Sequence, residues 1–193
     1  MTKHGLILLA LTAAACGKGD KAGGGGAAAK PIDVAAINAL VPAALKDKFT
    51  FEEGQIVEER GRHKTVYKLA VPKGWSQKDK AFGKLKPPTD LGFWTEFGAG
   101  TNCDGECTAK DWSAIVEKQG KGFGEGKILK DEKGPGKRTI VNELTSGDTY
   151  VLVAWWKDGD KEYTHCGGTL DKAVKEAAAA FEKACESVTI TEE

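Results

Sequence analysis

The sequence predicts an α+β fold, a mainly antiparallel sheet covered by helices, and three observations carry this prediction. The segment DTYVLVAWW, residues 148–156, is apolar on both faces, as expected of a central strand that is covered on both sides. Turn signals flank it, with KGPG at residues 133–136 and Asp158-Gly159 after it. An amphipathic helix follows, with apolar residues at steps of three and four: Leu170, Val174, Ala177, Phe181 and Ala184.

Residues 1–15 predict a secretory signal peptide. Lys3 precedes an apolar or small-residue stretch from Gly5 to Ala15. As a helix rising about 1.5 Å per residue, this stretch covers roughly 16 Å, whereas the hydrocarbon core of a bilayer is about 30 Å thick. A short basic region, a brief apolar region and small residues before a cleavage point are typical of signal peptides.

The end of this segment allows two interpretations of Cys16. Residues 13–16, AAAC, resemble the lipobox of bacterial lipoproteins, in which the cysteine is acylated, for example with palmitate, and becomes the first residue of the mature protein. Ala13 stands where leucine is usual. The alternative is ordinary cleavage after Ala15, which leaves a free thiol. We favour acylation because a glycine-rich tether, residues 17–30, follows at once, with a root-mean-square reach of roughly 20 Å.

The remaining residues, 31–193, are enough for a single domain with its own core. Lysine plus arginine and aspartate plus glutamate each number 28, and this balance argues against a nucleic-acid partner, which requires a basic face. A hydrophobic content of 40% with five tryptophans indicates a globular domain. No later apolar stretch approaches the 18 residues of a membrane span.

The first half of the domain predicts one helix and two strands. Asp33 is expected to cap a helix that Pro42 kinks or divides. Residues 64–75, KTVYKLAVPKGW, alternate in polarity and predict a strand. Residues 76–90 are charged and contain proline, which predicts an irregular segment. Residues 91–97, LGFWTEF, predict the next strand.

The second half of the domain predicts the remaining elements. Asp111 is expected to cap a short helix with Trp112, Ile115 and Val116 on its buried side. A flexible connection, KQGKGFGEGK at residues 118–127, and a hairpin around residues 133–136 follow. Adjacent strand residues face opposite sides, so Trp155 and Trp156 should each lie under a different helical layer. The strands KILKD and KRTIVNEL flank the hairpin turn, and Trp155 and Trp156 are expected to be core residues. We expect Thr169 to cap the long helix and residues 187–191, SVTIT, to form the last strand.

Four cysteines follow Cys16, and an even number in an exported chain predicts two disulfides: Cys103, Cys107, Cys166 and Cys185. If residues 170–184 form one helix, Cys166 and Cys185 sit at its ends, about 22 Å or more apart. Disulfide Cα atoms lie within about 7 Å, so that pair requires a bent approach. Pairing across residues 103–107 is sterically possible but leaves the same distant pair, and the connectivity stays open.

Two segments carry a family resemblance. VYKLAVPKGW is a strand followed by a P-x-G-W sequence, and YTHCGGTLDKAVKEAAAAFEKACESVTI is a hairpin strand, a long helix and a short strand. Together they resemble the PsbP/Mog superfamily of α-β-α sandwiches, which includes exported bacterial proteins. The resemblance spans roughly residues 50–192. It implies export and a sandwich fold, but no particular chemistry, because the family shares a scaffold more than a function.

A metal-binding or enzymatic alternative uses the loop around residues 103–107. Thiolates of Cys103, Cys107 and Cys166 with the imidazole of His165 are ligands that suit zinc. We favour disulfides because exported thiols oxidise and because adjacent His165 and Cys166 point to opposite faces of a strand.

Other chemical motifs have plainer explanations. The spacing of glycines at residues 120–126 fails the dinucleotide pattern because Glu125 takes the third glycine position. Only His63 and His165 follow the signal segment, and no serine has a nucleophile-elbow context, so the sequence predicts no enzyme. Carboxylates in predicted turns could serve as calcium ligands, but they are better explained as solvated turn residues: Asp104, Glu106, Asp111, Asp158 and Asp160.

These observations predict a bacterial lipoprotein of the cell envelope, anchored at Cys16 in the outer membrane and facing the periplasm or the surface. Its expected role is a non-catalytic binding or accessory module for an envelope protein or a small ligand, without a cofactor or a metal.

Overall fold

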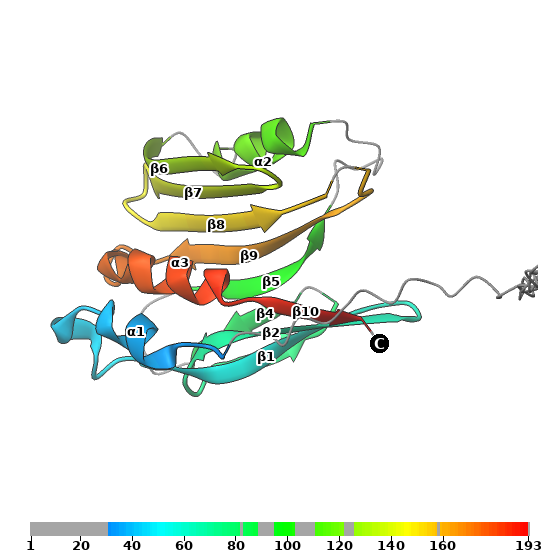
Figure 1. Ribbon diagram of the computed structural model, residues 1–193. Coiled ribbons are helices and arrows are strands. Elements are labelled where there is room, and N and C mark those ends of the chain that lie inside the picture. Colours follow the sequence, from blue (N-terminus) through cyan, green and yellow to red (C-terminus); the bar gives the residue numbers. More distant parts are fainter. Residues whose placement is uncertain are drawn as a thin grey trace, which may run out of the picture. The chain divides into compact units, whose positions relative to one another are not determined.

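Two antiparallel sheets and three α-helices make up the described part of the computed structural model (Figure 1). It covers residues 31–81, 83–88, 95–102, 111–121, 126–157 and 159–192, all within the second of the chain's two units, Pro31–Glu193. The helices are α1 (Val34–Ala39), α2 (Trp112–Lys121) and α3 (Ala178–Glu186), with 3-10 turns η1 (Ala43–Leu45) and η2 (Lys175–Ala177). None of these described helices is long and apolar enough to cross a membrane.

The strands divide into two sheets. Strands β1 (Phe51–Arg60), β2 (His63–Pro72) and β10 (Thr189–Glu192) form a three-stranded sheet in the order β1-β2-β10. The other sheet has the order β3-β4-β5-β9-β8-β7-β6. Its strands are β3 (Ser76–Asp79), β4 (Lys84–Lys86), β5 (Phe97–Asn102), β6 (Gly126–Gly134), β7 (Lys137–Leu144), β8 (Thr149–Trp155) and β9 (Tyr163–Leu170). Every named pair is antiparallel, so the predicted α+β class with a mainly antiparallel sheet is confirmed.

Strand β8 is covered on both faces, as its composition predicts. Val151 and Val153 join the core beneath α1 and α3, whereas Leu152 joins a second core beneath α2. Trp155 packs against the first core and Trp156 against the second. The prediction that these rings lie under different helical layers is confirmed, although both side chains are only partly buried.

The larger core is centred on Phe181 of α3, which is 1% exposed. Its ring centroid lies 5.1 Å from that of Phe51 in β1 and 5.2 Å from that of Phe97 in β5. Phe49 and Trp75 lie 5.6 Å and 6.0 Å away. Because β1 and β5 belong to different sheets, one aromatic cluster holds the two sheets together.

The predicted helix capped by Thr169 is wrong in its bounds. Strand β9 continues to Leu170, where the Thr169 carbonyl accepts a hydrogen bond from the Glu96 amide at 3.1 Å, and α3 begins only at Ala178. The apolar residues of the pattern are nevertheless all at most 1% exposed: Leu170, Val174, Ala177, Phe181 and Ala184. A strand end, a turn and a shorter helix therefore bury the same residues that one continuous helix would bury.

This correction also resolves the distance between Cys166 and Cys185. Their sulfurs form a disulfide with the Cα atoms 5.3 Å apart. From Cys166 the strand advances four residues to Leu170, about 13 Å at 3.3 Å per residue, and the helix then returns along it by a similar length. The sequence-based distance of about 22 Å assumed that the helix begins at residue 170. Because α3 begins only at Ala178 and runs back along β9, Cys185 lies beside Cys166.

Three other segments differ from the sequence prediction. Strand β1 carries five charged residues among its ten and was not predicted. The segment predicted to be irregular, residues 76–90, contains the short strands β3 and β4. The strand predicted at residues 91–97 lies largely outside the described residues, and β5 begins at Phe97.

The predicted helix starts are confirmed. The Asp33 Oδ1 accepts a hydrogen bond from the Ala36 amide at 2.9 Å, and Pro42 separates α1 from η1. The Asp111 Oδ1 accepts one from the Ala114 amide at 3.1 Å. Short polar side chains at these positions satisfy amides that the first helical turn leaves unpaired.

Candidate functional site

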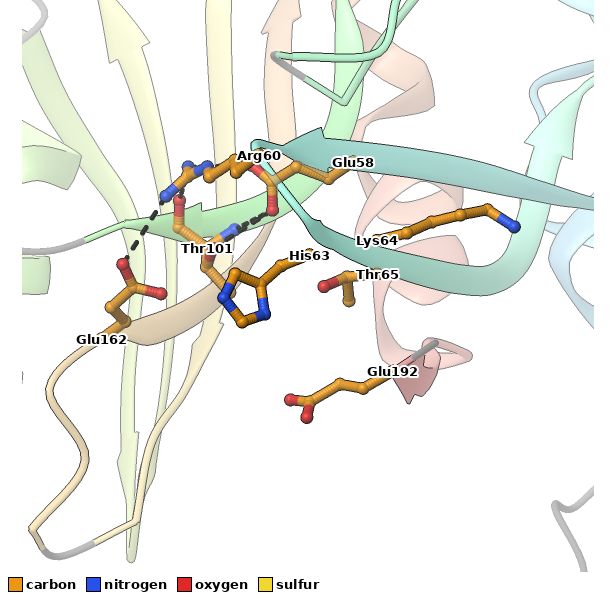
Figure 2. A pocket seen from close by; sticks show the side chains of 8 residues that line it. All are labelled: Glu58, Arg60, His63, Lys64, Thr65, Thr101, Glu162 and Glu192. Atoms are coloured by element: carbon orange, nitrogen blue, oxygen red, sulfur yellow. Dashed lines mark hydrogen bonds and ion pairs between the residues drawn. The ribbon is translucent and has the colours of Figure 1, made fainter.

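A cleft of about 420 Å³ opens beside the turn that joins β1 and β2 (Figure 2). We call it the charged cleft. Both sheets contribute to it, since its residues come from β1, β2 and β10 on one side and from β5 and the segment before β9 on the other. It is lined by Glu58, Arg60, His63, Lys64, Thr65, Thr101, Glu162 and Glu192.

The innermost group of the charged cleft is the carboxylate of Glu58, a residue that is 3% exposed. Its Oε2 accepts hydrogen bonds from the Tyr67 hydroxyl at 2.9 Å and from the Thr101 amide and hydroxyl at 3.0 Å and 3.1 Å. Its Oε1 lies 2.8 Å from a guanidinium nitrogen of Arg60. Burial, followed by the Glu58 charge, raises the pKa of Tyr67, so its hydroxyl stays a donor. Both carboxylate oxygens are therefore occupied, and Glu58 links β1, β2 and β5.

The rest of the charged cleft is open to solvent. Figure 2 shows the His63 ring between Thr101 and Thr65, with Glu192 facing the same space. Arg60 bridges toward Glu162 at 3.6 Å, and both of these side chains are more than two-fifths exposed. Exposed ion pairs contribute little free energy. The charged cleft is therefore a solvent-exposed polar surface. Beneath it, both oxygens of the Glu58 carboxylate already have hydrogen-bonding or ionic partners.

A second cavity, of about 410 Å³, lies where α2 covers the seven-stranded sheet. We call it the α2 cavity. Its residues come from α2, β4, β5, β8 and β9 and from the segment before β5. They are Lys84, Glu96, Phe97, Gly98, Ala99, Gln119, Tyr150, His165, Gly167, Gly168 and Thr169.

Two residues that line the α2 cavity each have a buried polar atom without a hydrogen-bond partner within the described structure, Nδ1 of His165 and Oε1 of Gln119. The His165 ring lies 6.0 Å from that of Tyr163, between centroids. Burial lowers the pKa of His165 to about 4. The imidazole is therefore neutral near pH 7.

The rim of the α2 cavity carries one ion pair. The Lys84 ammonium donates to both carboxylate oxygens of Glu96, at 3.1 Å and 3.2 Å. The Lys84 side chain is 48% exposed and the Glu96 side chain 29% exposed. The two charges compensate each other, so the cavity presents no net charge from these groups.

A third polar cluster is structural. Arg138 of β7 is 1% exposed and donates from Nε and a terminal nitrogen to the two carboxylate oxygens of Asp131, at 2.8 Å and 2.7 Å. It also contacts Glu117 at 2.7 Å and donates to the Ser113 carbonyl at 2.7 Å. These bonds fasten α2 to the sheet. Because its contacts are all internal, we assign this cluster no binding role.

Most of the site residues predicted around the 103–107 loop lie outside the part of the chain that the structure describes. Cys16, Cys103 and Cys107 lie outside the described residues, as do the turn residues Asp104, Glu106 and Asp158. Asp111 caps α2, and the carboxylate of the exposed Asp160 accepts a hydrogen bond from the Lys157 amide at 2.8 Å.

The zinc alternative with both His165 and Cys166 needs a correction. The Cys166 sulfur is bonded to Cys185, and Cys166 lies in the core beneath α3, whereas His165 lies in the α2 cavity on the opposite face. Within the described residues, no group of three or more His, Cys, Asp or Glu side chains could hold a metal ion.

The residues that organise both cavities were not singled out in the sequence, except His165. Glu58 lies in an unrecognised strand among other charged residues. Gln119 lies in the segment predicted to be a flexible connection, residues 118–127, and that prediction is wrong for residues 118–121 because α2 continues to Lys121. Neither has a spacing signal that separates it from solvated residues of the same type. Comparison with protein-family models and with curated proteins finds no match for this chain.

Proposed function

We propose that this chain is an exported, lipid-anchored binding module of the cell envelope. In this proposal Cys16 carries the lipid, residues 17–30 form the tether, and residues 31–193 form a non-catalytic domain that binds an envelope protein or a small ligand. Anchoring in the outer membrane and a PsbP/Mog-like α-β-α sandwich belong to the same proposal. Helices on both faces of the seven-stranded sheet support the sandwich.

The Cys166–Cys185 disulfide is the observation that carries the proposal. Both cysteines are 0% exposed and lie in the larger core. Disulfides form and persist in oxidising compartments such as the bacterial periplasm and are rare in the cytosol. A structural crosslink inside the core therefore favours export, which is also what the signal-like residues 1–15 predict.

Binding is favoured over catalysis by the state of the polar groups in the cavities. Glu58 is the most buried carboxylate of the charged cleft, and each of its oxygens already has a partner. A general acid or base must exchange a proton with a substrate, and a saturated carboxylate is poorly placed to do so. The α2 cavity, in contrast, is a concave space lined by a few polar side chains, including His165 and Gln119, which is typical of a binding site.

The test is the intact mass of the full-length chain, expressed in a bacterium and taken from the membrane fraction without reduction. The expected mass is that of residues 16–193 plus a lipid moiety, less four hydrogens for two disulfides. The Cys16→Ser variant, which cannot be acylated, should leave the membrane fraction. A wild-type mass without lipid would overturn the anchor. Alkylatable thiols at Cys103 and Cys107 together with bound metal would favour the metal-binding or enzymatic alternative.

A further inference from the structure

The α2 cavity differs from the charged cleft because two side chains of its lining, His165 and Gln119, each have a buried polar atom without a protein partner. From this difference we infer that the α2 cavity binds an uncharged ligand of monosaccharide size, held through its carbonyl or hydroxyl oxygens by His165 and Gln119. The inference deepens the proposed binding function and rests on it. It names the site and the chemical class of the ligand.

Which end of each side chain faces the α2 cavity follows from which of its polar atoms is buried. In His165, Nδ1 is buried, so Nε2 is the ring nitrogen left to meet the cavity that the residue lines. Buried N–H groups without an acceptor are rarer than unsatisfied acceptors. The proton therefore belongs on Nε2, where it can be donated to a ligand.

The same reasoning applies to Gln119, which lines the α2 cavity from a different element. Its Oε1 is buried without a partner, so the amide NH₂ is the end left to face the cavity. The side chain comes from α2, whereas His165 comes from β9. Side chains with donor groups from two separate elements thus line one cavity, and a ligand with acceptor oxygens could bond to both.

The charges around the α2 cavity select a neutral ligand. His165 is uncharged near pH 7, because burial lowers its pKa to about 4. Lys84 is the cation of the lining, and it already pairs with both oxygens of Glu96. Burying an anion without a free counter-charge is costly. A carboxylate or phosphate ligand is therefore disfavoured, and a cation has only the occupied Glu96 to meet.

The size and walls of the cavity agree with a compact ring. The volume of about 410 Å³ lies in the lower range of small-molecule sites. Gly98, Gly167 and Gly168 contribute backbone without side chains, and Tyr150 is an aromatic wall of the lining. Aromatic rings and exposed backbone are surfaces on which a sugar ring can pack while its oxygens meet polar groups.

The experiment compares three sugars that share one ring and differ in charge. The mature protein, purified from membranes in a sugar-free detergent, is titrated by calorimetry with neutral N-acetylglucosamine, anionic N-acetylmuramic acid and cationic glucosamine. We expect the neutral sugar to bind and to raise the thermal midpoint, and the charged sugars to bind at least tenfold more weakly. Absence of binding by the neutral sugar, or equal binding of all three, would overturn the inference.

Variants locate the site. Gln119→Leu and His165→Phe each remove one donor and should weaken binding of the neutral sugar about two- to tenfold. Gln55→Leu makes the same chemical change at an exposed position of β1 and should leave binding unchanged. If Gln55→Leu and Gln119→Leu have equal effects, the site is wrong. The membrane anchor is judged by intact mass and by the fractionation of Cys16→Ser, neither of which depends on sugar binding, so failure of this inference and failure of the proposed function remain distinguishable.

Discussion

Glu58 and His165 are both held inside the domain, but their surroundings are opposite. The Glu58 carboxylate has hydrogen-bonding or ionic partners on both oxygens, whereas the His165 imidazole has a buried nitrogen without any partner in the described structure. A buried polar group with all its partners stabilises the fold, and one without partners costs free energy. The comparison separates a structural network, in the charged cleft, from a site with unused bonding capacity, in the α2 cavity.

The largest loss of stability is expected from removing Glu58, the buried group whose bonds are all satisfied. Glu58→Ala removes the acceptor of the Tyr67 hydroxyl and of the Thr101 amide, and Tyr67 is 0% exposed. Leaving two donors without partners costs about 2 kcal/mol each, so the free energy of unfolding should fall by about 4 kcal/mol. Urea denaturation followed by tryptophan fluorescence measures it. Glu58→Gln keeps an acceptor oxygen and should lose less than half as much, and equal losses would contradict the hydrogen-bond explanation.

The next largest effect contrasts the two faces of β9. Replacing Cys166 and Cys185 together by alanine removes a crosslink whose partners are 19 residues apart, which should lower the free energy of unfolding by about 3 kcal/mol. His165→Phe, one residue away on the other face, removes an unsatisfied polar ring and should cost less than 1 kcal/mol. Chemical denaturation of both variants without reductant compares them, and a larger loss for His165→Phe would reverse the assignment of roles.

The pH dependence sharpens the comparison further. The pKa of His165 is about 4 in the folded protein, against about 6.5 in the unfolded chain. Between these values the unfolded state binds the additional proton, so stability should fall as pH is lowered from about 6.5 to about 4, by about 3 kcal/mol in all.

The carboxylates around Arg138 act in a lower pH window. Hydrogen bonding from Arg138 lowers the pKa of Asp131, so its stabilisation is present above its unfolded pKa and is lost only as pH falls below about 4. Denaturation midpoints measured at intervals from pH 7 to pH 4.5 therefore report mainly His165. The His165→Phe variant should flatten this dependence, and an unchanged slope would show that another group is responsible.

The smallest change in stability is expected from replacing Gln119, whose buried side-chain oxygen has no partner in the described structure. Gln119→Leu removes a buried oxygen without a partner and replaces it with apolar surface of similar size. We expect the free energy of unfolding to stay within about 1 kcal/mol of the wild type or to rise. A loss of several kcal/mol in thermal or urea unfolding would mean that the Gln119 amide is a structural group rather than one available to a ligand.

The sequence predicted the class of fold, the covered strand β8, the helix starts at Asp33 and Asp111 and the hairpin between β6 and β7. These depend on local signals, namely apolar runs, capping side chains and turn residues. It did not predict β1, because five of its ten residues are charged and its inward positions include Glu58. Tertiary contacts with Tyr67 and Thr101, which no local pattern encodes, make that glutamate an interior residue.

The candidate site was predicted less well than the fold. His165 was identified, but as a possible metal ligand beside Cys166, and the turn at residues 171–174 that separates strand from helix was not identified. The amphipathic period continued through that turn, so a helix beginning earlier satisfied the same pattern. The place of Gln119 depends on how α2 packs against β6, β7 and β8, and that packing is a long-range property.

The pairing of β10 with β2 has a consequence for the order in which the chain can mature. Thr189 lies opposite Lys68, more than a hundred positions earlier in the chain. A polypeptide that crosses a membrane from its amino end delivers β1 and β2 first, yet the strand that completes their sheet arrives last. In any chain that emerges amino end first, from the ribosome or through a membrane, the three-stranded sheet can therefore be completed only after β10 has emerged.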